Sequence, residues 1–171
     1  MGNPGRWGGV VIVAVVLGWT AAGGAQARAR PAGPARQLFR LINQARRSPR
    51  YRAETAGEAA PLRWDAALAQ VAVRHSRQMA RAGALSHSDA TASTPAGRVT
   101  GAGIGWTMVG ENVAMAPTAR DAQAMMMAEP AFQANHRGNI LNRRFDAVGI
   151  GVVRAGVELY ITEDFIRAAK P

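Results

Sequence analysis

The apolar positions of this chain follow a helical period over most of its length and a strand period near its end. Apolar residues recur at i, i+3, i+4 and i+7 between Leu38 and Ala45. This spacing predicts a helix that begins at Gln37. The helix should end near Ser48, because a proline at position 49 disfavours helical geometry in the residue before it.

The longest helix is expected from Asp65 to Ala82. Asp65 is a suitable N-cap, and Gly83 suits the position that follows the last helical residue. His75 lies beside the apolar stripe of this segment. We interpret it as a partly buried residue with one hydrogen-bond partner and leave it out of the candidate site.

Two further helices have start signals. Thr94 and Pro95 suit the cap and first position of a short helix, and Thr118 with Asp121 resembles a capping box. The helix after Thr118 contains three consecutive methionines and should stop or kink at Pro130. Methionine is adaptable core filler, so these side chains are expected in the core.

The pattern near the end of the chain predicts two strands. "AVGIGVV" alternates apolar residues with glycines, and "VELYITEDF" alternates Val157, Leu159 and Ile161 with polar or aromatic residues. The short "RAG" between them is typical of a hairpin connection. Helices followed by antiparallel strands predict an α+β fold in which the helices cover the sheet.

Residues 1–27 carry the pattern of a cleaved secretory signal. Arg6 precedes a short apolar run, and small residues lead to an Ala-x-Ala site at Ala27. The run is too short for a comfortable membrane span, so we expect no membrane span after cleavage and a secreted protein, extracellular or periplasmic. An uncleaved anchor is the alternative. Residues 28–36 should form a flexible N-terminus before a domain at 37–167.

Composition removes several classes of function. The chain has no cysteine, which excludes thiol catalysis and cysteine-based zinc sites. Its net charge of +10 is almost wholly due to arginine and allows weak attraction to anionic surfaces, although a composition bias explains it equally well. The arginines are scattered and aromatic residues make up only 6%, so no specific nucleic-acid binding is expected.

Four residues are candidates for chemistry: His87, Glu111, Glu129 and His136. We expect each of them at the end of a regular element, with His136 opening a loop, and element ends often meet at pockets. Two imidazoles and two carboxylates suit a divalent ion such as zinc, and they also suit acid–base work. Spacing alone does not separate these possibilities from four groups that are solvated separately.

Seven segments in order resemble the CAP superfamily of cysteine-rich secretory, antigen 5 and pathogenesis-related proteins, most of all its bacterial secreted SCP-like branch. They are "LINQAR", "LRWDAALAQVAVRHSRQMA", "LSH", "GENVA", "NHRGNIL", "VGIGV" and "YITEDF". The resemblance implies an α-β-α sandwich with a small antiparallel sheet between helical layers and an open cleft. It implies that His87 and His136 face each other there and bind any metal, with Glu111 and Glu129 acting through water or hydrogen bonds. Met126 replaces the family's usual aromatic residue.

Three functional classes follow. The first is a secreted binding module for a lipid, sterol or glycan-type ligand of the cell envelope, with one divalent metal, zinc, shaping the site. The second is a metal-dependent hydrolase of the peptidase type, in which Glu111 or Glu129 would act as the catalytic base. The third is a structural interaction domain in which the four residues form a polar network.

Overall fold

The structure, a computed structural model, describes residues 30–57, 59–89, 91 and 93–169. The predicted signal segment, residues 1–27, lies outside the described residues. None of the helices in the described ranges is long and apolar enough to cross a membrane.

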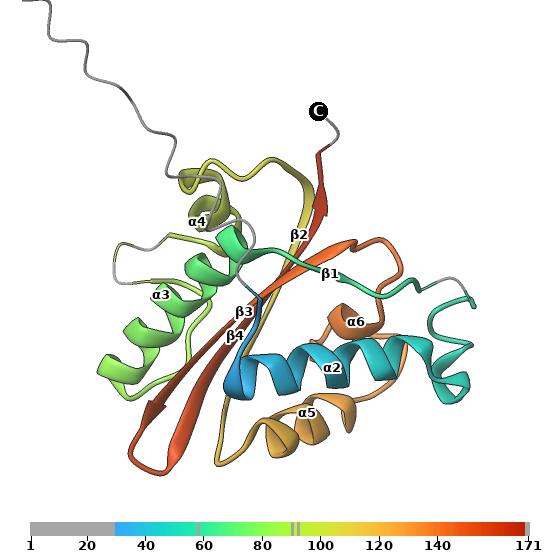
Figure 1. Cartoon of the computed structure of the whole chain (residues 1–171), viewed down its shortest axis with the longest axis horizontal. Coiled ribbons are helices and arrows are strands. Elements are labelled where there is room, and N and C mark those ends of the chain that lie inside the picture. The colour runs from blue at the N-terminus through green and yellow to red at the C-terminus, as the bar shows by residue number, and fades with distance from the viewer. Residues whose placement is uncertain (1–29, 58, 90, 92, 170–171) are drawn as a thin grey trace, which may run out of the picture.

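An open sheet of four strands lies between two layers of helices (Figure 1). One layer contains α2 (Gly33–Arg47), α5 (Ala119–Met127) and α6 (His136–Leu141), and a short 3-10 turn, η1 (Pro49–Tyr51), follows α2. The other layer contains α3 (Ala66–Ala82) and α4 (Pro95–Gly101). The strands are β1 (Arg63–Trp64), β2 (Trp106–Ala116), β3 (Ala147–Ala155) and β4 (Glu158–Ala168). This arrangement confirms the predicted α+β sandwich.

The strand order is β1-β3-β4-β2, so β2 and β1 lie at opposite edges. β4 pairs antiparallel with both β2 and β3, and β3–β4 is the predicted hairpin. The sheet is mixed, because the short strand β1 pairs parallel with β3 through Arg63–Ala147 and Trp64–Val148, while the three long strands are antiparallel as expected. A strand of two residues has no period from which a sequence pattern can be read.

The predicted helix caps are present. The side chain of Asp65 accepts a hydrogen bond from the backbone N–H of Leu68, and Gly83 ends α3 with a φ of 65°. Thr94 and Thr118 cap α4 and α5 in the same way. Local side-chain chemistry therefore fixes where these three helices begin.

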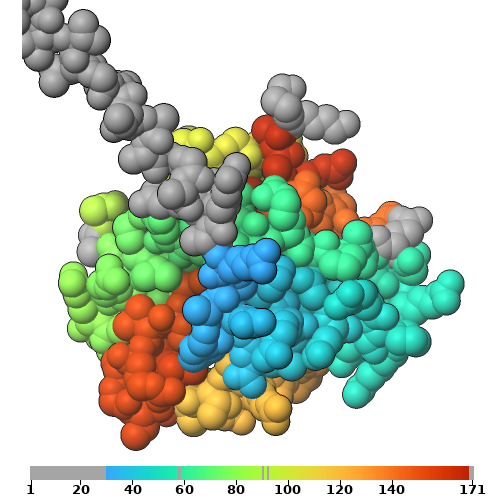
Figure 2. Space-filling model, viewed as in Figure 1, coloured from blue at the N-terminus to red at the C-terminus, as the bar shows by residue number. Residues whose placement is uncertain are grey.

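Two boundaries differ from the sequence prediction. α2 begins at Gly33 rather than Gln37, so part of the expected flexible N-terminus is helical. Pro34 is compatible with this, because a proline in the first turn needs no backbone hydrogen-bond partner. Val157, expected inside a strand, lies in the β3–β4 turn with 77% of its surface exposed. This end of the hairpin reaches the surface between α3 and α2 (Figure 2).

Helix α3 packs directly against the backbone of β3. Gly149 and Gly151 lie on the side of β3 that faces α3, where a Cβ atom would meet backbone atoms of Leu68, Ala69 and Ala72 at 2.2–2.4 Å. On the opposite side of β3, Val148 and Ile150 join the main core with α2, α5 and α6. The glycines thus set how close one helical layer comes to the sheet.

We predict that Gly151→Ala lowers the free energy of unfolding by about 3 kcal/mol, because the added methyl group must displace the α3 backbone. Urea denaturation measures this change. Gly101→Ala is the control, because nothing lies within 4 Å of its Cβ position at the end of α4. It should leave stability unchanged or raise it by less than about 1 kcal/mol. Equal effects of the two substitutions would contradict this packing argument.

Candidate functional site

The candidate site is built around β2, the edge strand opposite β1. Side chains alternate along a strand, so neighbouring residues of β2 serve the two helical layers. Glu111 points to the layer of α3 and α4, where it meets Arg98 and two histidines. Asn112 points to the other layer, where it contacts Met126 of α5 and His136 of α6. The site therefore has two halves, one on each side of the sheet.

Glu111 organises the first half. Only 1% of its side chain is exposed, and one carboxylate oxygen lies 2.8 Å from His87 Nδ1. The other oxygen accepts a hydrogen bond from Arg98 Nη2. Arg98 also donates to the carbonyl groups of His87 and Ser93 at 2.9 and 2.8 Å. One guanidinium thus neutralises the buried carboxylate and bonds the loop that carries His87 at two points.

His75 of α3 also bonds the loop that carries His87. Its side chain is buried, and its Nε2 lies 2.7 Å from the carbonyl oxygen of Ser86. Because a carbonyl only accepts, Nε2 carries the proton. This is its one hydrogen bond within the described part of the chain, which agrees with our interpretation of the sequence, although burial is nearly complete. His75 Nε2 also lies 3.9 Å from Glu111, so it helps to position His87.

Asp164 lies beside Glu111 on β4, and the two residues are paired across the strands. Burial first, and then the negative charge of Glu111, raise the pKa of Asp164 well above its usual range, although Arg98 acts in the opposite direction. No described donor bonds either carboxyl oxygen of Asp164. Two ionised carboxylates side by side, with no donor between them, would repel each other, so the protonated form of one is favoured. Asp164 is the neutral partner.

Glu163 is the corresponding buried acid on the other side of the sheet. Its only hydrogen bond among the described residues comes from Asn112, at 3.0 Å. Complete burial raises the pKa of Glu163 to about 7, and the bond from Asn112 opposes this only in part.

The second half of the site is the pair Glu129 and His136. One carboxylate oxygen of Glu129 lies 2.5 Å from His136 Nδ1, and the other accepts the backbone N–H of His136 at 2.8 Å. Burial tends to raise the pKa of Glu129, but the hydrogen bond and charge of His136, with backbone N–H groups, hold it below its usual value. Arg137 then ties this turn to Glu54. The pair is fixed although about a third of each side chain is exposed.

Asparagine amides join the two halves. Asn139 donates to the carbonyl oxygen of Glu111 at 3.2 Å and to the side-chain oxygen of Asn112 at 2.9 Å. Asn112 donates in turn to the carbonyl oxygen of His136 at 3.2 Å. Arg46 anchors the far end of α6 by donating to the carbonyls of Ile140 and Asn142. The two asparagines of "NHRGNIL" therefore act as local scaffolding of the site.

Two of the four candidate residues occupy a different setting from the one predicted. Glu111 lies in the middle of β2 and not at the end of an element, and His136 begins α6 and does not open a loop. "NHRGNIL" is helical because Asn135 caps it by accepting from the N–H of Gly138. His87 and Glu129 do follow helices, as expected.

The structure brings the four residues together as two His–Glu pairs and not as one cluster. No three His, Cys, Asp or Glu side chains of the described ranges form a group that could hold a metal ion. Beside His87 lies a hollow of about 320 Å³, lined also by Pro95, Trp106 and Glu111. His87 is the most open member of the site, with 57% of its side chain exposed.

Sequence reasoning missed Arg98, Asp164 and Glu163. Arg98 looks like one of many scattered arginines, and the two acids lie within a strand pattern, in "YITEDF". The available signal was that a strand with two adjacent acids and buried neighbours must neutralise them or find partners for them.

We predict that Glu163→Gln weakens the pH dependence of stability. The pKa of Glu163 is raised from 4.5 to about 7, so the folded state binds its proton more tightly than the unfolded chain. Wild type should therefore lose stability from this group as pH rises from 4.5 to about 7, by up to about 3 kcal/mol. Urea denaturation across this window measures the difference between the two proteins.

The control is Glu158→Gln, at the partly exposed start of β4, which should keep the wild-type dependence. Identical pH profiles for wild type and Glu163→Gln would show that the acid does not titrate as the structure implies.

The sequence of the chain matches a known protein family. A sequence model described as CAP, the cysteine-rich secretory protein family, matches residues 39–165. No curated protein matches the chain.

Three solved structures are similar to the chain. An extracellular SCP-domain protein from Bacillus anthracis is 27% identical with a TM-score of 0.63; the match covers 81% of this chain and 45% of that one. The chain thus spans less than half of that protein. An outer surface protein of Borrelia burgdorferi is 15% identical, with a TM-score of 0.65 over 78% of this chain and 91% of that one.

NaASP2, whose crystal structure was determined with Zn²⁺, is 16% identical, with a TM-score of 0.53 over 81% of this chain and 82% of that one. At this identity it shows the shared fold alone. The family match spans most of the chain and includes all four candidate residues. Although it lacks cysteine, the chain belongs to the CAP family of cysteine-rich secretory proteins.

Proposed function

We propose that this protein is an extracellular binding module whose cleft, on the β2 edge, holds a divalent zinc ion through Nε2 of His87 and Nε2 of His136. A glycan-type ligand of the cell envelope then completes the coordination of the metal. One observation carries the proposal: each histidine has its Nδ1 bonded to a carboxylate, at 2.8 Å for His87 and 2.5 Å for His136.

The hydrogen bonds decide which nitrogen faces outward. An ionised carboxylate only accepts, so the proton of each imidazole lies on Nδ1. Nε2 of a neutral imidazole then carries a free lone pair, and no described residue bonds Nε2 of His87 or His136. A carboxylate behind a histidine is the usual support for a metal ligand, because it fixes the ring and raises its basicity. Glu111 and Glu129 fill this supporting role.

The donor set suits zinc with two protein ligands. Imidazole nitrogen is a good zinc ligand, and two histidines leave two positions of a tetrahedral ion for water or for ligand oxygens. The zinc in the NaASP2 crystal structure supports this choice of metal. The hollow beside His87 adds the ring of Trp106 and the hydroxyl of Thr94, which suit a sugar with its apolar face and hydroxyl groups.

Binding is favoured over hydrolysis because Glu111 is already engaged. A general base must reach the water that it deprotonates. Glu111 is 1% exposed, and its two oxygens are bonded to His87 and Arg98. Glu129 is bonded to the ring of His136 and to backbone N–H groups of His136 and Arg137. Neither carboxylate is left free to act as a base.

The proposed extracellular location rests on the predicted secretory signal and on the family. The similar protein from Bacillus anthracis is an extracellular protein. A cysteine-free domain with a buried core of ordinary size needs no disulfide for stability outside the cell.

We predict that zinc raises the free energy of unfolding of the purified protein by about 2.7 kcal/mol at 100 times its dissociation constant. His87→Ala and His136→Ala should each remove most of this gain, because one imidazole alone is a weak site. Urea denaturation with zinc or with chelator measures it.

Gln133→Ala is the matched control, since Gln133 is exposed in the loop that leads into α6 and should leave the zinc effect intact. A protein that zinc does not stabilise, or one stabilised equally in both histidine variants, would rule out the paired-histidine site. The four residues would then be a structural polar network.

A further inference from the structure

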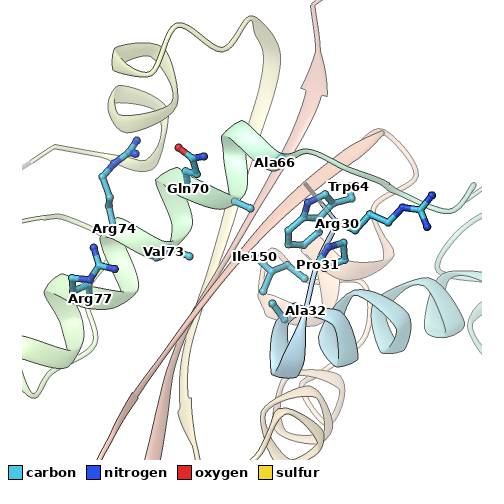
Figure 3. A pocket seen from close by; sticks show the side chains of 12 residues that line it. Arg30, Pro31, Ala32, Trp64, Ala66, Gln70, Val73, Arg74, Arg77 and Ile150 are labelled. Carbon is cyan, nitrogen blue, oxygen red and sulfur yellow. The ribbon is translucent and has the colours of Figure 1, made fainter. Parts of the chain in front are cut away.

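We propose a second binding site at the opposite edge of the sheet, for a long-chain organic anion: an acyl or alkyl chain that ends in a carboxylate or phosphate. The site is a groove of about 430 Å³ between the start of α2, β1 and the first half of α3 (Figure 3). This volume lies in the range of small-molecule sites, roughly 300–1,000 Å³. The inference is independent of the zinc site, because the two share no residue.

The groove exists because β1 is too short to cover the edge of β3. β1 pairs only with Ala147 and Val148, so from Gly149 onward no strand of the described residues pairs with β3 on that side. The start of α2 and the helix α3 flank this edge from the two layers. Two alanines of α3, Ala66 and Ala69, face the space between them and leave it open.

The floor of the groove is apolar. Trp64, Ile150, Ala35 and Val73 line it together with the two alanines of α3. Trp64 is held by an edge-to-face contact with Phe39, with ring centroids 5.6 Å apart, so it forms a fixed wall. In Figure 3, Trp64 and Ile150 lie close together between α2 and α3.

The margin of the groove is positive. Arg30 lies on the α2 side, and Arg74 and Arg77 lie one turn apart on α3. None of these three arginines takes part in an ion pair among the residues that the structure describes. Among the residues with a described placement, no Asp or Glu lines the groove. An apolar floor with three uncompensated cations matches a ligand with an apolar chain and an anionic head group.

The geometry disfavours an added peptide strand. Such a strand must reach the backbone of the open edge. Ile150 is the residue of β3 in the groove, and only 1% of it is exposed. The backbone of β3 at this edge is therefore covered by side chains. A neutral or cationic chain would gain the same apolar contacts and leave the arginines unpaired.

Calorimetric titration of the purified protein with sodium salts of straight-chain carboxylates, below their micelle concentrations, tests the proposal. Affinity should rise about fourfold with each methylene group until the groove is full, because each buried methylene contributes a constant transfer free energy. Dodecyl phosphate tests a phosphate head group of membrane-lipid type, and dodecyltrimethylammonium is the cationic control. The cation should bind at least tenfold more weakly than laurate.

Two variants localise the site. The double variant Arg74→Gln with Arg77→Gln should weaken laurate binding about tenfold and keep the chain-length dependence. Arg81→Gln, on the last turn of α3 outside the groove, is the matched control and should bind as wild type does.

The result that overturns the proposal is an affinity that ignores chain length, head-group charge or the double variant. The His87→Ala and His136→Ala proteins should still bind laurate, so failure of the zinc site and failure of the groove can be told apart. Tighter binding of dodecyl phosphate than laurate would indicate membrane lipid as the source of the anion, and the reverse would indicate a free fatty acid.

Discussion

The architecture of the site depends on the buried ion pair between Glu111 and Arg98. A carboxylate in the middle of an edge strand, with 1% of its side chain exposed, would be strongly unfavourable without a compensating charge. Arg98 supplies this charge and, through the carbonyls of His87 and Ser93, fixes the loop over it. The remaining acid beside them, Asp164, is kept neutral. A single guanidinium therefore determines both the charge of the site and the position of its most exposed histidine.

The two faces of β2 contact different helical layers and contribute different groups to the site. One face presents Glu111 to His87, and the other presents Asn112, which bonds the backbone of His136. The same division explains the two sites that we propose. The long edge strand β2 gathers polar groups from both layers, whereas the short strand β1 leaves an apolar groove at the opposite edge.

Local features of the sequence predicted much of this fold. Caps at Asp65 and Thr118 fixed helix starts, and the alternation of β3 and β4 fixed a hairpin. The sequence also named four candidate residues, but it showed only some of the partners that surround them in the structure. Arg98, Asp164 and Glu163 acquire their roles from cross-strand and cross-layer contacts, which leave no period in the sequence. β1 was missed because two residues carry no pattern, and its parallel pairing depends on where α3 places them.

The proposed metal site depends on which ring nitrogen of each histidine carries the proton, and long-range ¹H–¹⁵N correlation spectra of the side chains at neutral pH measure this most directly. The chain has three histidines, which makes assignment with single variants straightforward. We predict that His87 and His136 carry their proton on Nδ1, and that His75, which donates from Nε2 to Ser86, shows the opposite tautomer. Added zinc should shift the Nε2 signals of His87 and His136 alone. A proton on Nε2 of either residue, or Nε2 signals that zinc leaves unchanged, would contradict the proposed metal site.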